Sequence, residues 1–245
     1  HIAFARSTDE GMTWSRQRII AGPRKAGDGH MASWGYPLVS KSGRIYVLYS
    51  QSVGKFDTFP HTTGRLDGIH SDDNGQTWSD PIDLTSVARD MQDPNWRCSV
   101  PGPGGAIQDQ AGRLIVPIWK VAPSDVLAIF SEDHGRTWQR GAQVPGKQGG
   151  DEDQLVELAD GRILLDIRQH GGPHRWMALS SDGGRTWSEP RPGQPVTPVC
   201  CAIERYTLRS AGDDRDRIVW TGPLGPGRNK LVVRTSYDEG QTFAH

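Results

Sequence analysis

Three charged side chains stand where short apolar strands are expected to begin or end. Glu152 opens the segment DEDQLVEL, Arg168 closes the apolar segment GRILLDIR, and Arg228 lies in the Gly- and Pro-rich stretch GPGRNK. A guanidinium group binds a carboxylate through two parallel hydrogen bonds and stays charged, and a glutamate can draw a proton from a neighbouring hydroxyl. The set therefore suits a site for a carboxylate ligand. The competing interpretation is a solvated acidic run and two arginines that cap the rims of strands.

Other candidate sites are weaker. His170 and His174 occur in HGGPH, where Gly and Pro prevent the helix that such a pair of metal ligands needs. The Gly-rich stretch 102–105 is followed by a strand, whereas a phosphate site needs a helix N-terminus there. We therefore expect neither a metal nor a cofactor. Trp96 and Trp119 are interpreted as packing residues more readily than as platforms for a sugar.

A repeated eight-residue motif organises the chain around these residues. Its form is S-x-D-x-G-x-T-[WF], and it reads STDEGMTW at 7–14, SDDNGQTW at 71–78, SEDHGRTW at 131–138, SSDGGRTW at 180–187 and SYDEGQTF at 236–243. The Asp can accept hydrogen bonds from backbone amides of a tight turn, and the Gly can adopt positive φ. A turn repeated in every unit indicates scaffold, so these Asp residues are not expected to be catalysts or calcium ligands.

A second pattern keeps step with the first. A Gly-Arg or Asp-Arg pair opens an apolar strand at GRIYVLYS, GRLIVPIW, GRILLDIR and DRIVWTGP. Each unit then reads as strand, Arg turn, strand, loop, strand, Asp motif, strand, which is a four-stranded propeller blade. The phasing predicts an all-β, single-domain propeller over 1–245, truncated at both ends. Complete blades are expected near 30–90, 98–147 and 150–197, with two partial blades, the first over 1–22 and the last from about 198.

The same phasing sorts residues onto two faces. The Arg turns and the Asp motifs share one face, and the starts of the first and third strands share the other. Glu152, Arg168 and Arg228 all fall on this second face, as does a long loop between Gln51 and Arg65. A long loop on a binding face is a candidate specificity element.

The five Asp motifs resemble the Asp boxes of sialidases. The segments VPGPGGAIQDQAGRLIVPIW, DEDQLVELADGRILLDIR and GPGRNKLVVRTSYDEGQTF resemble segments of the same family, so the resemblance covers essentially the whole chain. It implies a six-bladed propeller, incomplete here, with about three full and two partial blades.

The resemblance also implies roles for the three charged residues. Glu152 matches the glutamate that hydrogen-bonds a tyrosine nucleophile, and Arg168 and Arg228 match two of three arginines that clamp the sialic acid carboxylate. No residue matches the nucleophile, the acid/base aspartate or the first arginine, which the resemblance places outside 1–245. Tyr206 and Tyr237 fall towards the wrong face. Asp151 and Asp153 depart from the family's usual Asn-Glu-Cys/Ser context, so the sugar acid accepted is open.

The resulting hypothesis is a retaining exo-α-sialidase acting on sialylated glycans or related sugar-acid glycosides, with residues 1–245 alone inactive. Two alternatives are a propeller that only binds glycans and an Asp-box scaffold for protein partners. A base such as Glu152 favours the enzyme over the first, since binding alone needs no base. Paired arginines on one face argue against the second.

Composition limits the remaining choices. The net charge of -1 gives no basic surface for nucleic acid, and no apolar run approaches the roughly 20 residues of a membrane span. Three cysteines, Cys98, Cys200 and Cys201, cannot all pair within the chain, and we interpret them as small buried side chains. The compartment stays open, although the usual location of glycan substrates favours a secreted or periplasmic protein.

Overall fold

The computed structural model describes residues 1–22, 31–52, 64–103, 105–146, 149–225 and 227–244, and strands dominate them. The helical segments in this described part are α1 (Thr85–Ala88) and a 3-10 turn (Arg209–Ala211). The prediction of an all-β chain is therefore confirmed. None of the described helices is long and apolar enough to cross a bilayer. The long loop expected between Gln51 and Arg65 falls largely on 53–63, outside the described residues.

The described strands form five antiparallel sheets, which we number as blades in chain order. Blade 1 is β1 (Ile2–Phe4) and β2 (Arg18–Ala21). Blade 2 is β3 (Ala32–Val39), β4 (Ile45–Gln51), β5 (Arg65–Ser71) and β6 (Ile82–Asp83). Blade 3 is β7 (Cys98–Pro101), β8 (Ile107–Gln108), β9 (Leu114–Val121), β10 (Asp125–Ser131) and β11 (Gln139–Arg140).

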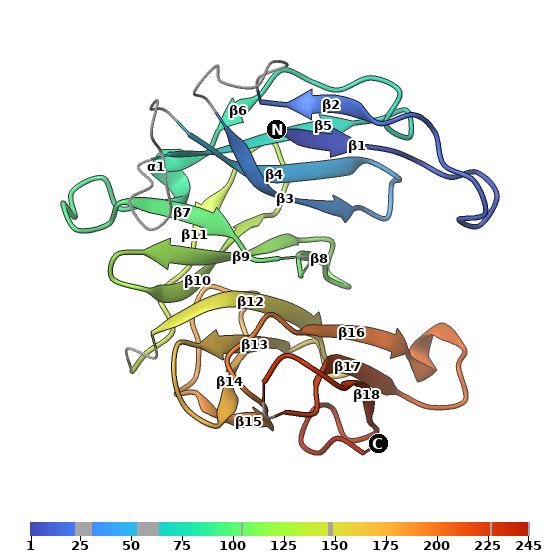
Figure 1. The fold of residues 1–245 in the computed structure, drawn as a ribbon, viewed down its shortest axis with the longest axis vertical. Helices are drawn as coiled ribbons and strands as arrows, with labels where there is room; N and C mark the ends of the chain where they lie inside the picture. The colour runs from blue at the N-terminus through green and yellow to red at the C-terminus, as the bar shows by residue number, and fades with distance from the viewer. Residues whose placement is uncertain (23–30, 53–63, 104, 147–148, 226, 245) are drawn as a thin grey trace.

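Blade 4 is β12 (Gly150–Glu157), β13 (Ile163–Gln169), β14 (His174–Ser180) and β15 (Arg191–Pro195), and blade 5 is β16 (Ala202–Thr207), β17 (Arg217–Pro223) and β18 (Leu231–Ser236). Figure 1 shows the blades following one another along the molecule in chain order. The three complete and two partial blades expected from the phasing are the ones observed. In blade 3, two short strands, β7 and β8, pair with β9 where the other complete blades have a single strand.

The strand register confirms the two faces. In blade 2, Ile45 pairs with Val39 on one side and with Ser71 on the other, so the Arg turn and the Asp motif lie at the same end of the blade. Figure 1 shows this end at the right, where β3 turns into β4 and where the first Asp motif follows β1. The candidate site residues belong to the opposite end of the strands.

Each Asp motif is a closed hydrogen-bonded turn. In the third copy, the Asp133 carboxylate accepts from the Thr137 backbone amide at 2.8 Å and from its hydroxyl at 2.6 Å, while Ser131 bonds Asp133 and accepts from the Gly135 amide. These bonds stabilise the charged carboxylate and lower the pKa of Asp133 to about 2, the two bonds from Thr137 being the largest favourable causes. The motif Asp residues are thus used inside their own turns.

The Asp-motif turns also join neighbouring blades. Four of the five turns, those of blades 2 to 5, present a backbone carbonyl that accepts from a side chain of the preceding blade. The four joints are Arg18 to Gln76 (3.0 Å), Tyr46 to His134 (2.7 Å), Arg113 to Asp182 (3.3 Å) and Arg191 to Gly240 (2.8 Å). Every consecutive pair of blades is therefore connected at this end.

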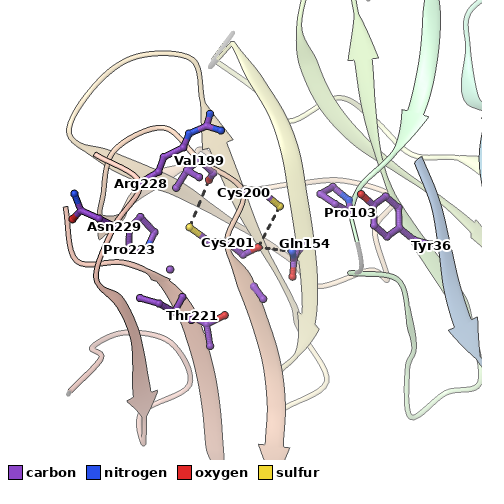
Figure 2. A pocket seen from close by; sticks show the side chains of 13 residues that line it. Tyr36, Pro103, Gln154, Val199, Cys200, Cys201, Thr221, Pro223, Arg228 and Asn229 are labelled. Atoms are coloured by element: carbon purple, nitrogen blue, oxygen red, sulfur yellow. Dashed lines mark hydrogen bonds between the residues drawn. The ribbon is translucent and has the colours of Figure 1, made fainter. Parts of the chain in front are cut away.

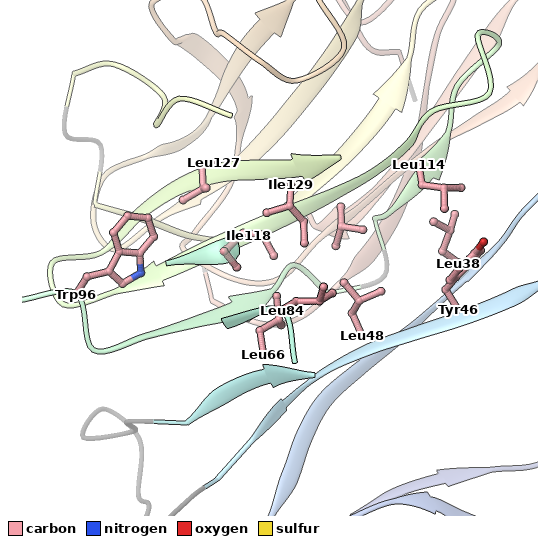
Figure 3. Close-up of a cluster of buried hydrophobic side chains, with 12 residues drawn as sticks. Leu38, Tyr46, Leu48, Leu66, Leu84, Trp96, Leu114, Ile118, Leu127 and Ile129 are labelled. Atoms are coloured by element: carbon pink, nitrogen blue, oxygen red, sulfur yellow. The ribbon is translucent and has the colours of Figure 1, made fainter. Parts of the chain in front are cut away.

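Apolar side chains fill the space between blades. The cluster between blades 2 and 3 includes Leu48, Leu66, Leu114 and Leu127, all nearly inaccessible to solvent, and Figure 3 shows them meeting from the two sheets. Comparable clusters lie between blades 3 and 4 and between blades 4 and 5. Because β9 is covered on both sides, all eight of its residues are buried. This packing holds the inner strands that carry the candidate site.

Candidate functional site

Glu152 and Arg168 meet directly across two neighbouring strands. Glu152 lies near the start of β12 and Arg168 near the end of β13, which the antiparallel register places at the same end of blade 4. One guanidinium nitrogen, Nη1, donates a short hydrogen bond to the Glu152 carboxylate. The two side chains are 23% and 20% exposed, so the pair is reachable by a ligand yet partly desolvated.

A bulge in β12 gives the acidic run its geometry. The pairing of β12 with β13 shifts between Gly150 and Asp153, which breaks the simple alternation of side chains at this point. Asp151 and Asp153 are buried, whereas Glu152 stays partly open to solvent. The DED run is therefore three differently placed carboxyl groups, which argues against the interpretation of a solvated acidic stretch.

The Asp151 carboxylate connects the parts of the site. One oxygen accepts from the Glu152 backbone amide at 2.7 Å and lies 3.5 Å from Nε of Arg168, and the other lies 2.8 Å from Nε2 of His170. Burial raises the pKa of Asp151, while the charges of Arg168 and His170 act in the opposite direction. Asp151 thus fixes the backbone at Glu152 and faces the side chains of both Arg168 and His170.

A hollow of about 580 Å³ opens above this cluster, and we call it the Glu152 hollow. Its polar lining includes Glu152, Arg168 and His170, and its aromatic lining is Trp34 and Trp119. The two indole rings pack edge to face, with centroids 6.4 Å apart. A pocket with aromatic walls and a few convergent polar groups is typical of a small-ligand site.

Arg228 lines a second hollow of about 500 Å³, together with Tyr36, Gln154, Cys200 and Leu231. Figure 2 shows Arg228 on the side of this Arg228 hollow away from Tyr36. The charge of Glu152 contributes, after burial, to raising the pKa values of both Tyr36 and Cys200. The two hollows lie beside the same strand, because β12 contributes Glu152 to the first and Gln154 to the second.

A buried ion pair supports the site from below. Nε of Arg175 donates to Asp166 at 2.8 Å, and its other nitrogens donate to the carbonyls of Glu152 (3.2 Å) and Val199 (2.8 Å). Trp220 of blade 5 donates to the same Asp166 oxygen at 3.1 Å. Arg175 and Asp166 therefore bind the strand that carries Glu152 to the neighbouring blade.

Comparisons with known proteins bear on this arrangement. The family model described as a BNR repeat-like domain matches residues 1–245. The chain belongs to this BNR repeat-like family. A sialidase of Micromonospora viridifaciens is 31% identical over 99% of this chain and 40% of its own length. A sialidase of Bacteroides fragilis is 25% identical over 99% of this chain and 48% of its own length.

The solved structures agree with the fold. "Hadza microbial sialidase Hz136" superposes with a TM-score of 0.84 at 26% identity, over 98% of this chain and 50% of that one. This BNR repeat-like chain therefore spans about half the length of the relatives that it matches. The resemblance to the sialidase family noted in the sequence is confirmed.

The structure distributes the predicted site residues over the two hollows. Glu152 and Arg168 are in contact, as expected for two residues on one face, while Arg228 lines the second hollow. Trp96 is a core residue at 2% exposure, and Trp119 borders the Glu152 hollow. Tyr206 and Tyr237 line neither hollow, in keeping with their expected face.

Sequence reasoning missed the support for these residues in the BNR repeat-like chain. Asp151 was treated only as a departure from the family pattern, and Asp166 was not singled out. The signal available for Asp166 was its charge inside the otherwise apolar strand GRILLDIR, since a buried charge needs a partner.

Asp153 has no such partner within the described residues. Its side chain is fully buried, and neither carboxyl oxygen accepts a hydrogen bond from any described group. Burial raises the pKa of Asp153 well above its usual range. A carboxyl in this state is kept protonated, because ionising it would leave an uncompensated charge in the core.

Proposed function

We propose that this protein is an exo-α-sialidase that removes terminal sialic acid, or a related 2-keto sugar acid, from glycans with retention of configuration. The observation that carries the proposal is the contact between Glu152 and Arg168 in an open hollow with aromatic walls. The sialidase names of the relatives support it. A propeller used only as a protein scaffold has no need of a largely buried pair of a carboxylate and a guanidinium group.

In this mechanism Arg168 and Arg228 bind the substrate carboxylate. A carboxylate on the anomeric carbon would repel a carboxylate nucleophile, and sialidases use a tyrosine instead. The neutral phenol is a weak nucleophile, so a neighbouring glutamate must take its proton as the phenolic oxygen attacks. Glu152 has this role in the proposal.

The substrate carboxylate would replace Glu152 as the hydrogen-bond partner of the Arg168 guanidinium. In the free protein, Arg168 pairs with Glu152. A bound carboxylate competes for the same donors, since a guanidinium presents five N–H groups in a fixed plane. Substrate binding thereby releases the Glu152 carboxylate from its hydrogen bond with Arg168, so that the carboxylate can accept the proton of the phenol.

The test is hydrolysis of a fluorogenic α-sialoside by the complete protein and by two variants. Glu152→Gln should lower kcat by at least about 100-fold, as expected for loss of a proton acceptor. Glu189→Gln, which changes an exposed glutamate in the loop before β15, should leave it unchanged. A folded protein that binds free sialic acid but releases no aglycone would refute the enzyme and leave the glycan-binding alternative. We also propose that residues 1–245 alone are inactive, because they contain no match to the nucleophile or the acid.

A further inference from the structure

His170 lies beside Arg168, directly after the end of β13 at Gln169. The two side chains face the same Asp151 carboxylate, at 3.5 Å from Nε of Arg168 and 2.8 Å from Nε2 of His170. Both line the Glu152 hollow. A ligand held at Arg168 by its carboxylate would therefore lie in the same hollow as His170.

The imidazole is held in place before any ligand arrives. Nε2 lies 2.8 Å from the buried Asp151 carboxylate, and the side chain of His170 is 52% exposed whereas that of Asp151 is 4% exposed. The same carboxylate binds the Glu152 backbone amide, so the imidazole and the candidate proton acceptor share one support. A carboxylate that fixes a histidine in this way sets its tautomer and ring orientation.

The tautomer leaves one nitrogen for a ligand. When Nε2–H donates to Asp151, Nδ1 of the neutral ring is an acceptor. No group in the described part of the chain forms a hydrogen bond with Nδ1. An acceptor fixed at the edge of a hollow suits a hydroxyl group, and the indole rings of Trp34 and Trp119 suit the C–H faces of a sugar.

We infer that His170 is a substrate-contacting, specificity-determining residue whose Nδ1 accepts a hydrogen bond from one hydroxyl of the sugar acid bound at Arg168. Asp151 is its positioning residue. This inference rests on the sialidase function proposed above. It gives a role to a histidine that is not expected to bind a metal, and to the buried aspartate that contacts it.

The test compares single hydroxyl deletions in a ligand with changes at His170. The probe is 2-deoxy-2,3-didehydro-N-acetylneuraminic acid and a set of analogues that each lack one hydroxyl, with affinities for the complete protein measured by calorimetry. In the parent protein, loss of the contacted hydroxyl should weaken binding about tenfold, the scale of one hydrogen bond. In His170→Gln, whose amide can still reach Asp151 but has no group in the Nδ1 position, loss of that same hydroxyl should cost nothing.

A control variant separates this contact from a general effect. His70→Gln alters another histidine that lies near an aspartate, Asp72, in blade 2 (3.8 Å), away from the Glu152 hollow, and should leave every affinity unchanged. If His170→Gln weakens the parent ligand and all analogues by the same factor, or weakens none, the inference is wrong while the proposed function stands. If the unaltered protein does not bind the parent ligand, the proposed function fails and the inference fails with it.

Discussion

The buried carboxyl of Asp153 predicts an unusual dependence of stability on pH. In the unfolded chain this group ionises near pH 3.9, whereas in the fold it is fully buried, without a described hydrogen-bond partner, and its pKa is raised. Folding therefore takes up a proton at any pH above the unfolded pKa and below the folded one. The stability contributed by this group is complete below the unfolded pKa and decreases as pH rises towards the folded pKa.

Replacing Asp153 by Asn removes that decrease. While the native carboxyl stays protonated, the free energy of unfolding of the unaltered protein loses about 1.4 kcal/mol for each pH unit relative to the variant. Between pH 5 and pH 7 the variant should gain up to about 3 kcal/mol on this account. The amide of the variant is also buried without a hydrogen-bond partner, and this changes the free energy of unfolding by an amount that does not vary with pH.

Urea unfolding of the complete protein at pH 5, 6 and 7 measures the slope directly. For Asp153→Ser, the free energy of unfolding should depend on pH as it does for Asp153→Asn, because both variants lack the ionisable group. Its value should differ by a constant amount, because serine leaves a smaller side chain. A stability difference that stays constant from pH 5 to pH 7 in both variants would refute the reasoning. It would mean that the carboxyl is ionised in the fold and finds compensation from groups outside the described residues.

The remaining predictions concern the support and the lining of the site. Asp166→Asn should destabilise the fold by about 3 to 5 kcal/mol, since it leaves the buried Arg175 without its counter-charge, as urea unfolding would show. Arg168→Lys should raise KM for the fluorogenic sialoside about tenfold or more because a lysine cannot bind a carboxylate bidentately; an unchanged KM would exclude the clamp. Cys200 is exposed, which corrects the expectation that all three cysteines are buried. Partial desolvation and then the charge of Glu152 raise the pKa of its thiol, so it should react with iodoacetamide more slowly than a free thiol at pH 8. Glu152→Gln should speed that reaction and shift its pH profile downwards, as mass spectrometry would detect, and equal rates in the two proteins would contradict the coupling.

The sequence predicted the blades better than it predicted the site. The Asp motif and the Arg turn are local, and their alternation along the chain is enough to phase the strands and to put Glu152 and Arg168 at one end of blade 4. The contacts of Asp151 depend on a bulge in β12, and no residue pattern announced that bulge. The hydrogen bonds of Arg175 reach Val199, and its partner Asp166 also accepts a hydrogen bond from Trp220 of the next blade. These contacts depend on packing between blades, which sequence spacing does not describe. Likewise, Trp96 and Trp119 are both buried, as their interpretation as packing residues expects, and only the assembled blades show that Trp119 also borders the Glu152 hollow.

The joints at the Asp-motif turns have a consequence for how such a protein can diversify. Successive motif starts are separated by unequal stretches of chain, yet the motifs of blades 2 to 5 all receive a bond from the blade before them. Part of this variation lies at the opposite end of the strands, where the hollows lie, and part lies in the turn between β16 and β17, which is longer than the equivalent turns of blades 2 to 4. Connections between blades and the chemistry of the ligand are separated in space, so loops around the hollows can be lengthened, shortened or exchanged without disturbing the contacts that hold neighbouring blades together. Such a protein can change its ligand by evolution or by engineering of these loops, while the hydrogen bonds between neighbouring blades are retained.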